Sequence, residues 1–205
     1  TLSVMRVEQG RFVPVAYQFD ELDDHGMVWF EGSEFAMAGD AGQLDQADQL
    51  LMMLTDAGPQ APATLRPAQG TIVADIAVAR NCHFYLVEGN RQRSQNYYVA
   101  HDIDNGMTRT ALYELNVEPE NELNWLYLGY QGYQGDGSII DTLKMRMSAG
   151  VLSRFTRMSL DNHNLRPKQV GHLLGPIRSV MHLRTKVVLA GIPVMTIQVQ
   201  AMRYA

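Results

Sequence analysis

Cysteine is nearly absent from this chain of 205 residues, in which Cys82 is the only one. A single thiol cannot form an internal disulfide, and it cannot supply the cysteine pairs of a structural zinc site. The sequence also lacks a His-Glu-x-x-His motif, a phosphate-binding glycine loop and a Gly-x-Ser-x-Gly motif. We therefore expect no metal, no cofactor and no catalysis, although a site assembled from distant positions stays open.

Long hydrophobic runs are absent as well. No apolar stretch approaches the roughly 18 residues of a membrane-spanning helix. The first residues, Thr1 to Phe12, lack the apolar core of a signal peptide, although a chain cut from a longer precursor would start in the same way. We expect no membrane span, and either an assembly in the cytoplasm or incorporation into a particle.

The composition excludes a disordered chain, because 46% of the residues are hydrophobic and 19% are charged. A length of 205 residues suits one large domain, so the sequence predicts a single domain over residues 1–205. The loop 58–70 is the one candidate for an internal boundary, because its first ten residues contain three prolines.

Alternation of apolar and polar residues is the dominant pattern, and it predicts strands. The clearest case is Ile177–Leu189, where apolar residues at most odd positions alternate with basic residues at several even positions. Residues 190–193 then form a turn, and Val194–Tyr204 returns with the same period. One face of this hairpin should be apolar and the other basic. The chain is expected to be mainly β, a sandwich or barrel built from antiparallel hairpins.

One segment has a different period. Leu44, Ala47, Leu51 and Leu54 are spaced three or four residues apart within residues 42–57, and Gly58-Pro59 follows as a stop signal. This spacing predicts one amphipathic helix. An α+β fold is the alternative to the mainly β fold.

The stretch His101-Asp102-Ile103-Asp104-Asn105-Gly106 concentrates polar side chains and looks at first like a ligand site. Its spacing does not fit a calcium loop, which needs glycine at the sixth position and glutamate at the twelfth. Asn105-Gly106 is the preferred pair for a two-residue type I′ turn. A turn there would place Asp102 opposite Arg109, and we expect a structural hairpin.

The remaining histidines form no motif. His163 lies in a polar turn, and His172 and His182 are ten residues apart. Whether His101, His163 or His172 binds a ligand is left open by the sequence. His101, Asp102 and His182 are the candidates if the protein is a small-ligand carrier or an enzyme in a β-barrel.

Charge is distributed very unevenly along the chain. Residues from Thr142 to Ala205 include ten Lys and Arg residues, and Asp161 is the only acidic residue among them, so this part carries a net charge of +9. The whole chain carries −5, so residues 1–141 carry −14. The two parts could meet within the fold, meet between subunits, or leave the basic third free for phosphate groups.

These observations favour a non-catalytic structural or assembly subunit of a virion, phage tail or filament-like particle. It would associate with itself or with other subunits through its acidic N-terminal and basic C-terminal surfaces. The alternatives are a nucleic-acid-binding module and the small-ligand or enzymatic barrel. The residues expected to make the interactions are Arg154, Arg157, Arg178, Arg184, Lys186, Tyr130 and Tyr133.

Overall fold

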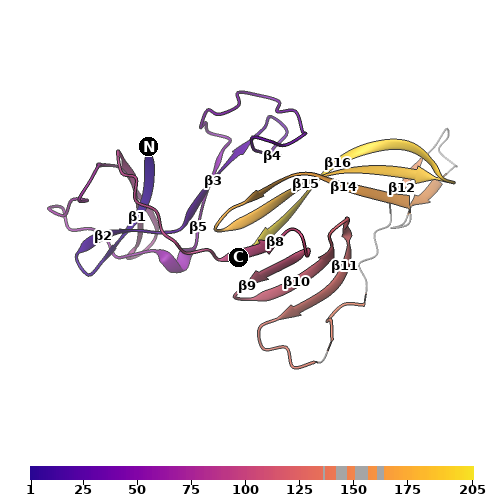
Figure 1. Cartoon of the computed structure of the whole chain (residues 1–205). Coiled ribbons are helices and arrows are strands. Elements are labelled where there is room, and N and C mark those ends of the chain that lie inside the picture. Colours follow the sequence, from indigo (N-terminus) through magenta and orange to yellow (C-terminus); the bar gives the residue numbers. More distant parts are fainter. Residues whose placement is uncertain (136, 142–146, 151–156, 161–163) are drawn as a thin grey trace.

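The computed structural model describes residues 1–135, 137–141, 147–150, 157–160 and 164–205. In this part of the chain, five antiparallel sheets account for the regular structure, and the one helical element is η1, a 3-10 turn at Leu54–Asp56 (Figure 1). A mainly β fold is thus confirmed. Each sheet is open, with two distinct edge strands. No helix in the described part of the chain has the length and hydrophobicity of a membrane span.

Sheet I lies at the N-terminal end of the molecule and has the strand order β2-β1-β7-β6 (Figure 1). Its strands are β1 (Leu2–Glu8), β2 (Arg11–Pro14), β6 (Thr71–Ala79) and β7 (Cys82–Glu88). Apolar side chains pack on both faces, because Met5 and Tyr85 belong to one cluster and Val4 and Phe84 to another. The sheet is therefore covered on both sides.

The proline-rich loop 58–70 covers one face of sheet I. Gly58 forms an isolated bridge with His83, and the Ala61 N–H donates to the Tyr85 hydroxyl at 2.7 Å. Leu65 packs against the cluster that contains Met5 and Tyr85. These contacts place the loop against the sheet.

Sheet II replaces the helix expected over residues 42–57, and that prediction is wrong. The sheet consists of β3 (Tyr17–Leu22), β4 (Val28–Trp29) and β5 (Gln49–Met52), in the order β4-β3-β5. The α+β alternative fails for the same reason, because η1 is the only helical element in the part of the chain that is described.

Aspartate side chains explain why this segment is not helical. The two carboxylate oxygens of Asp48 accept the N–H groups of Leu22 at 2.9 Å and Asp45 at 2.8 Å, and Asp45 accepts the Ala47 N–H at 2.6 Å. Such local bonds compete with the helical backbone pattern. Leu50 and Met52 pack on sheet I, which the extended backbone of β5 allows.

Sheet III contains the hairpin that the His101–Gly106 stretch predicts. Its strands are β8 (Val99–Asp102), β9 (Met107–Thr110), β10 (Tyr113–Glu118) and β11 (Asn121–Tyr130), in the order β11-β10-β9-β8. The hairpin is confirmed, but its register is not, since Asp102 lies opposite Met107 rather than Arg109. Of the Asn105-Gly106 pair only Gly106 has positive φ, at 63°, so the turn spans four residues, 103–106.

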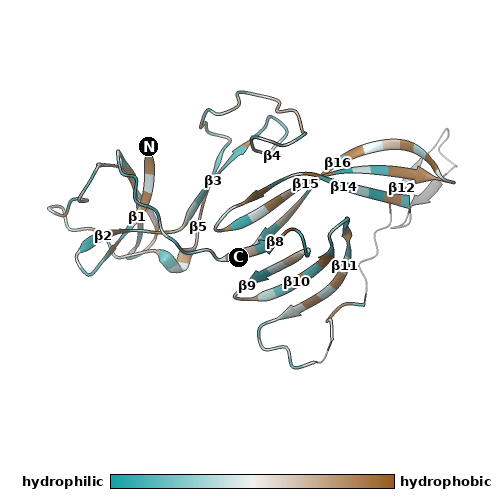
Figure 2. Cartoon of the chain, in the orientation of Figure 1, coloured by the Kyte–Doolittle hydropathy of each residue, from teal (hydrophilic) through white to brown (hydrophobic). Residues whose placement is uncertain are grey.

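Sheet IV is the predicted terminal hairpin with a third strand added. It consists of β14 (Leu165–Leu174), β15 (Arg178–Leu189) and β16 (Ile192–Tyr204), and its β15–β16 turn is Ala190-Gly191. Hydrophobic and hydrophilic residues both lie along these three strands (Figure 2). Leu165 and Val187 pack with Leu123 of β11, which joins sheets III and IV. A separate two-stranded sheet contains β12 (Met147–Gly150) and β13 (Arg157–Leu160).

The expected basic outer face of β15 is wrong in its first half. Arg178 is only 3% exposed and His182 only 1%. Val28 and Phe30 of the N-terminal third pack against Val180. Val180 lies between Arg178 and His182 on the same face of β15. The N-terminal third therefore covers this half of the face, and its basic residues become exposed only farther along the strand.

Candidate functional site

The basic residues proposed for interaction lie in different environments. Arg154 lies outside the described residues, and Arg157 is the first residue of β13, whose side chains are also outside them. Arg178 is buried. Lys186 is exposed, while Arg184 is half-buried and binds the Glu34 carboxylate at 2.6 Å. Only Arg184 and Lys186 of this set are thus seen at the surface.

Among the residues that the structure describes, three ion pairs join the acidic N-terminal part to the basic C-terminal third. Arg178 Nε donates to Asp20 Oδ2 at 2.5 Å, and Arg203 donates to Glu122 at 2.7 Å, with all four side chains less than a tenth exposed. Arg184 and Glu34 form the third pair at the surface. Part of the charge asymmetry is therefore neutralised within the fold.

Four cations of β14 and β15 form a basic patch, which we define as Arg166, Lys168, Arg184 and Lys186. The antiparallel register places Arg166 directly opposite Lys186, and Lys168 directly opposite Arg184. Like charges in facing positions destabilise a sheet, so an anionic group nearby would be favourable. Glu34 is the only acidic side chain paired with this patch among the residues that the structure describes.

An acidic segment adjoins the basic patch. Residues 20–48 contain nine Asp and Glu residues and no Lys or Arg. Its exposed carboxylates include Asp24, Glu31 and Asp40, and Glu34 connects the segment to the patch through Arg184. The Glu34 N–H also donates to the Val170 carbonyl of β14 at 3.3 Å. Two surfaces of opposite charge are thus neighbours on one molecule.

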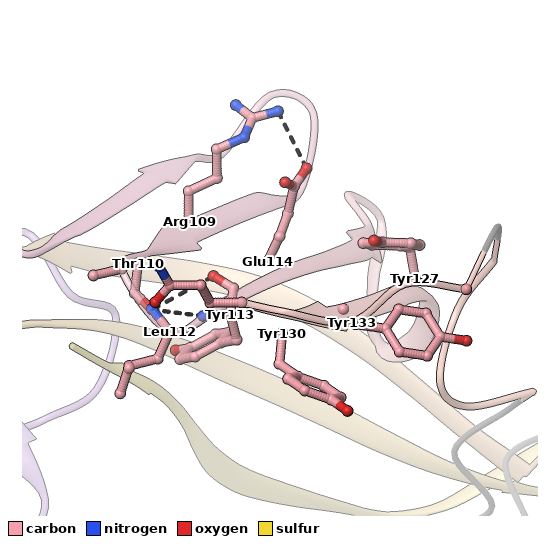
Figure 3. A pocket seen from close by; sticks show the side chains of 12 residues that line it. Arg109, Thr110, Leu112, Tyr113, Glu114, Tyr127, Tyr130 and Tyr133 are labelled. Atoms are coloured by element: carbon pink, nitrogen blue, oxygen red, sulfur yellow. Dashed lines mark hydrogen bonds and ion pairs between the residues drawn. The ribbon is translucent and has the colours of Figure 1, made fainter.

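A tyrosine groove lies at one end of sheet III and has a volume of about 330 Å³. Arg109 and Glu114 form an ion pair of 3.4 Å at one end of the groove, and the Tyr133 ring lies at the other end (Figure 3). The centroids of the Tyr130 and Tyr133 rings are 5.5 Å apart. The other residues that line the groove are Thr110, Ala111, Leu112, Tyr113, Tyr127, Gly129, Gln131 and Gly135.

Backbone hydrogen bonds fix the two turns that flank the groove. The Gln131 N–H donates to the Leu112 carbonyl at 2.8 Å, and the Tyr133 N–H donates to the Tyr130 carbonyl at 3.0 Å. Tyr113 donates its hydroxyl to the Tyr204 carbonyl at 2.8 Å, which ties the groove to sheet IV. Burial raises the pKa of Tyr113. Hydrogen bonds therefore fix the backbone turns that flank the groove.

Two glycines leave room for two of the tyrosine rings. A Cβ atom at Gly129 would collide with the end of the Tyr127 ring, and one at Gly135 would collide with the end of the Tyr133 ring. Each ring thus lies along the chain over the glycine two residues later. The sequence signal is Tyr127-Leu128-Gly129, which precedes the two Tyr-Gln-Gly units and makes three Tyr-x-Gly triplets in a row. The set of interaction residues expected from the sequence included Tyr130 and Tyr133 but not Tyr127.

His101 is held by a hydroxyl group. Its Nδ1 lies 2.7 Å from Thr108 Oγ1, across the β8–β9 ladder, while its buried Nε2 has no hydrogen-bond partner in the described part of the chain. Burial and then the positive charge of Arg203 lower the pKa of His101 from 6.5 to about 4. Asp102 accepts bonds from Asn105 within the turn, and these bonds lower its pKa. The two side chains therefore have structural partners.

The other histidines do not converge on a site. His182 lies between the Phe30 and Phe35 rings, and burial lowers its pKa. His172 is exposed and 3.4 Å from Gln169, whereas His163 lies outside the described residues. Within the part of the chain that the structure describes, no group of three or more His, Cys, Asp or Glu residues could hold a metal ion.

Comparisons with known proteins give no relative for this fold. The chain matches no protein-family model, and no curated protein or solved structure is significantly similar to it. The function is therefore argued from the surfaces described above.

Proposed function

We propose that this protein is a non-catalytic subunit of a larger assembly, such as a virion, a tail or a filament. The observation that carries the proposal is the basic patch, in which two pairs of cations face each other across β14 and β15. Facing like charges are stabilised when a carboxylate-rich surface covers them. The acidic segment of residues 20–48 is such a surface.

The positions of the two surfaces suit an interface between copies. The patch and the acidic segment are neighbours, since Arg184 and Glu34 touch. In two copies related by a two-fold axis, each patch can face the acidic segment of the other copy. Such contacts add to the Arg184–Glu34 ion pair, and exposed Lys168 and Lys186 are free to make them.

The proposal is tested by measuring the mass in solution at low and high salt. At about 50 mM salt the protein should be oligomeric, and at about 500 mM it should shift toward the monomer, because exposed charges are screened over a few ångströms there. The double variant Lys168→Glu, Lys186→Glu should be a monomer at both salt concentrations, because its patch no longer attracts the acidic segment of the other copy.

The matched control is Arg80→Glu with Arg91→Glu, which makes the same change in net charge at exposed positions away from the patch. This control should associate like the wild type. A wild-type protein that is a monomer at low salt and high protein concentration would contradict the proposal.

Nucleic-acid binding is the second candidate function, and it is favoured by the same patch. Four cations on two neighbouring strands could follow a phosphate backbone. Fluorescence anisotropy with a mixed-sequence duplex of about 20 base pairs tests this, since affinity should fall steeply with salt and be lost in the Lys168→Glu, Lys186→Glu variant. No binding at low salt would remove this candidate.

A further inference from the structure

The tyrosine groove has the chemistry of a ligand site that is separate from the charged surfaces. Tyr130 is 55% exposed and Leu112 is 62% exposed, so apolar and aromatic surface is open to solvent here. The volume of about 330 Å³ is within the usual range for small-ligand sites. Its turns are already held by hydrogen bonds, so a ligand would bind without ordering them.

The charge around the groove argues against nucleic acid. Among the residues that the structure describes, Arg109 and Glu114 are the only charged side chains that line the groove. That arginine lies 3.4 Å from Glu114, so the pair contributes no net charge to the groove. A phosphate backbone would therefore meet no unpaired cation among the described residues of the groove.

The hydrogen-bonding groups favour a ligand that both donates and accepts. Glu114 offers an acceptor, and Arg109 and Gln131 offer donors. A proline-rich peptide presents carbonyl acceptors but few N–H donors, so Arg109 would remain the only donor to the carboxylate. The hydroxyl groups of a sugar satisfy both kinds of group at once.

The rings that lie over the glycines complete this match. Tyr127 and Tyr133 each cover a glycine, and both rings line the same groove as the Arg109–Glu114 pair. The C–H faces of a pyranose ring are apolar and stack on aromatic rings, while its hydroxyl groups point outward to polar side chains. We propose that the tyrosine groove binds a neutral oligosaccharide.

The experiment measures amide shifts in ¹H–¹⁵N spectra on titration with four neutral oligosaccharides: cellohexaose, maltohexaose, hexa-N-acetylchitohexaose and mannohexaose. At least one should bind and shift the amides of Leu112, Gln131 and Gly132. Tyr133→Ala should weaken binding by about tenfold or more, a change typical of losing one stacked ring. Tyr133→Phe keeps the ring and should bind within about threefold of wild type.

Two controls make the result specific. Tyr97→Ala removes a tyrosine that is 68% exposed outside the groove, and it should bind like the wild type. Glu114→Ala should weaken binding without unfolding the protein, because its side chain is partly exposed. The proposal is overturned if none of the four sugars binds at about 10 mM, a concentration well above typical weak dissociation constants. Groove shifts with decaproline instead, or sugar binding that survives Tyr133→Ala, would also overturn it.

Discussion

Arg178 makes side-chain contacts with three strands that are distant in sequence. Its guanidinium donates to Asp20, to the Tyr204 hydroxyl at 2.9 Å and to Gln49 Oε1 at 3.0 Å. It also lies over the Tyr204 ring, 5.5 Å from the centroid. One side chain thus joins β3, β5 and β16, and every nitrogen of the guanidinium has a hydrogen-bond partner.

Replacing Arg178 should therefore destabilise the protein strongly. Arg178→Met leaves the Asp20 carboxylate buried without its cation, and the free energy of unfolding should fall by about 3–5 kcal/mol in urea denaturation. Asp20→Asn in the same chain should recover part of the loss, because the buried charge is gone. The control Arg166→Met is at an exposed position and should change stability by less than about 0.5 kcal/mol. Similar values for the two single variants would refute the role of the buried pair.

His101 should make the stability depend on pH. Its pKa is about 4 in the folded protein, below the ordinary value of 6.5, so the unfolded chain takes up the proton first. Stability is then complete above about pH 6.5 and is lost as the pH falls toward 4. Allowing for solvent screening at this half-buried site, we expect a loss of about 1 kcal/mol between pH 7.5 and pH 5.

His101→Gln tests this assignment, because glutamine does not titrate. The loss of stability between pH 7.5 and pH 5 should be smaller in this variant by about 1 kcal/mol. An NMR titration of the His101 ring in the wild type should have its midpoint near 4. A midpoint near 6.5 would show that the ring is not buried as described.

At the scale of elements, the β8–β9 hairpin depends on Gly106. Its φ is 63°, and an added Cβ atom would overlap the Val117 carbonyl of β10. Gly106→Ala should cost about 3 kcal/mol or more, since backbone strain adds to the overlap with β10. Gly10→Ala is the matched control, with a φ of 73° and no atom near the added Cβ. It should cost about 1 kcal/mol, and equal losses would show that the contact with Val117 is unimportant.

Sequence patterns predict where the strands of this fold lie better than they predict which other elements those strands contact. The alternation in Ile177–Leu189 identifies β15, and Asn105-Gly106 marks the β8–β9 turn. The register of that hairpin differs from the expected one by two residues. Gly106 packs closely against Val117 of the neighbouring strand β10, and the sequence of the hairpin itself does not reveal this contact. The helix over 42–57 fails because Leu50 and Met52 pack on sheet I, and spacing alone does not reveal that contact.

The sequence also identifies some residues of the candidate sites but not those that strand pairing brings together. Tyr130 and Tyr133 are among the interaction residues expected from the sequence, and both line the groove. Arg109 and Glu114 are missed because they meet Tyr127 only across the strands of sheet III. Lys168 and Arg166 are missed because a basic patch depends on the pairing of β14 with β15, which the sequence does not specify.

At the scale of the whole molecule, the assembly proposal predicts that charge reversal can be complemented. Glu31→Lys with Asp40→Lys reverses exposed charges of the acidic segment, and this variant should be monomeric by itself. The Lys168→Glu, Lys186→Glu variant should also be monomeric. A one-to-one mixture should associate, because each altered surface then faces its opposite charge. The masses in solution of the two variants and of their mixture provide the measurement, and a mixture of monomers would contradict the interface.

The Asp20–Arg178 ion pair also has a consequence for the order in which the chain folds. The two residues are 158 positions apart, and the chain is made from its N-terminus. β3 and β5 can pair early, but Asp20 has no counter-charge until β15 has left the ribosome. Contacts with such large sequence separation form slowly and late. The N-terminal third therefore reaches its native packing only when the C-terminal third arrives, and a chain that ends before β15 should not fold stably.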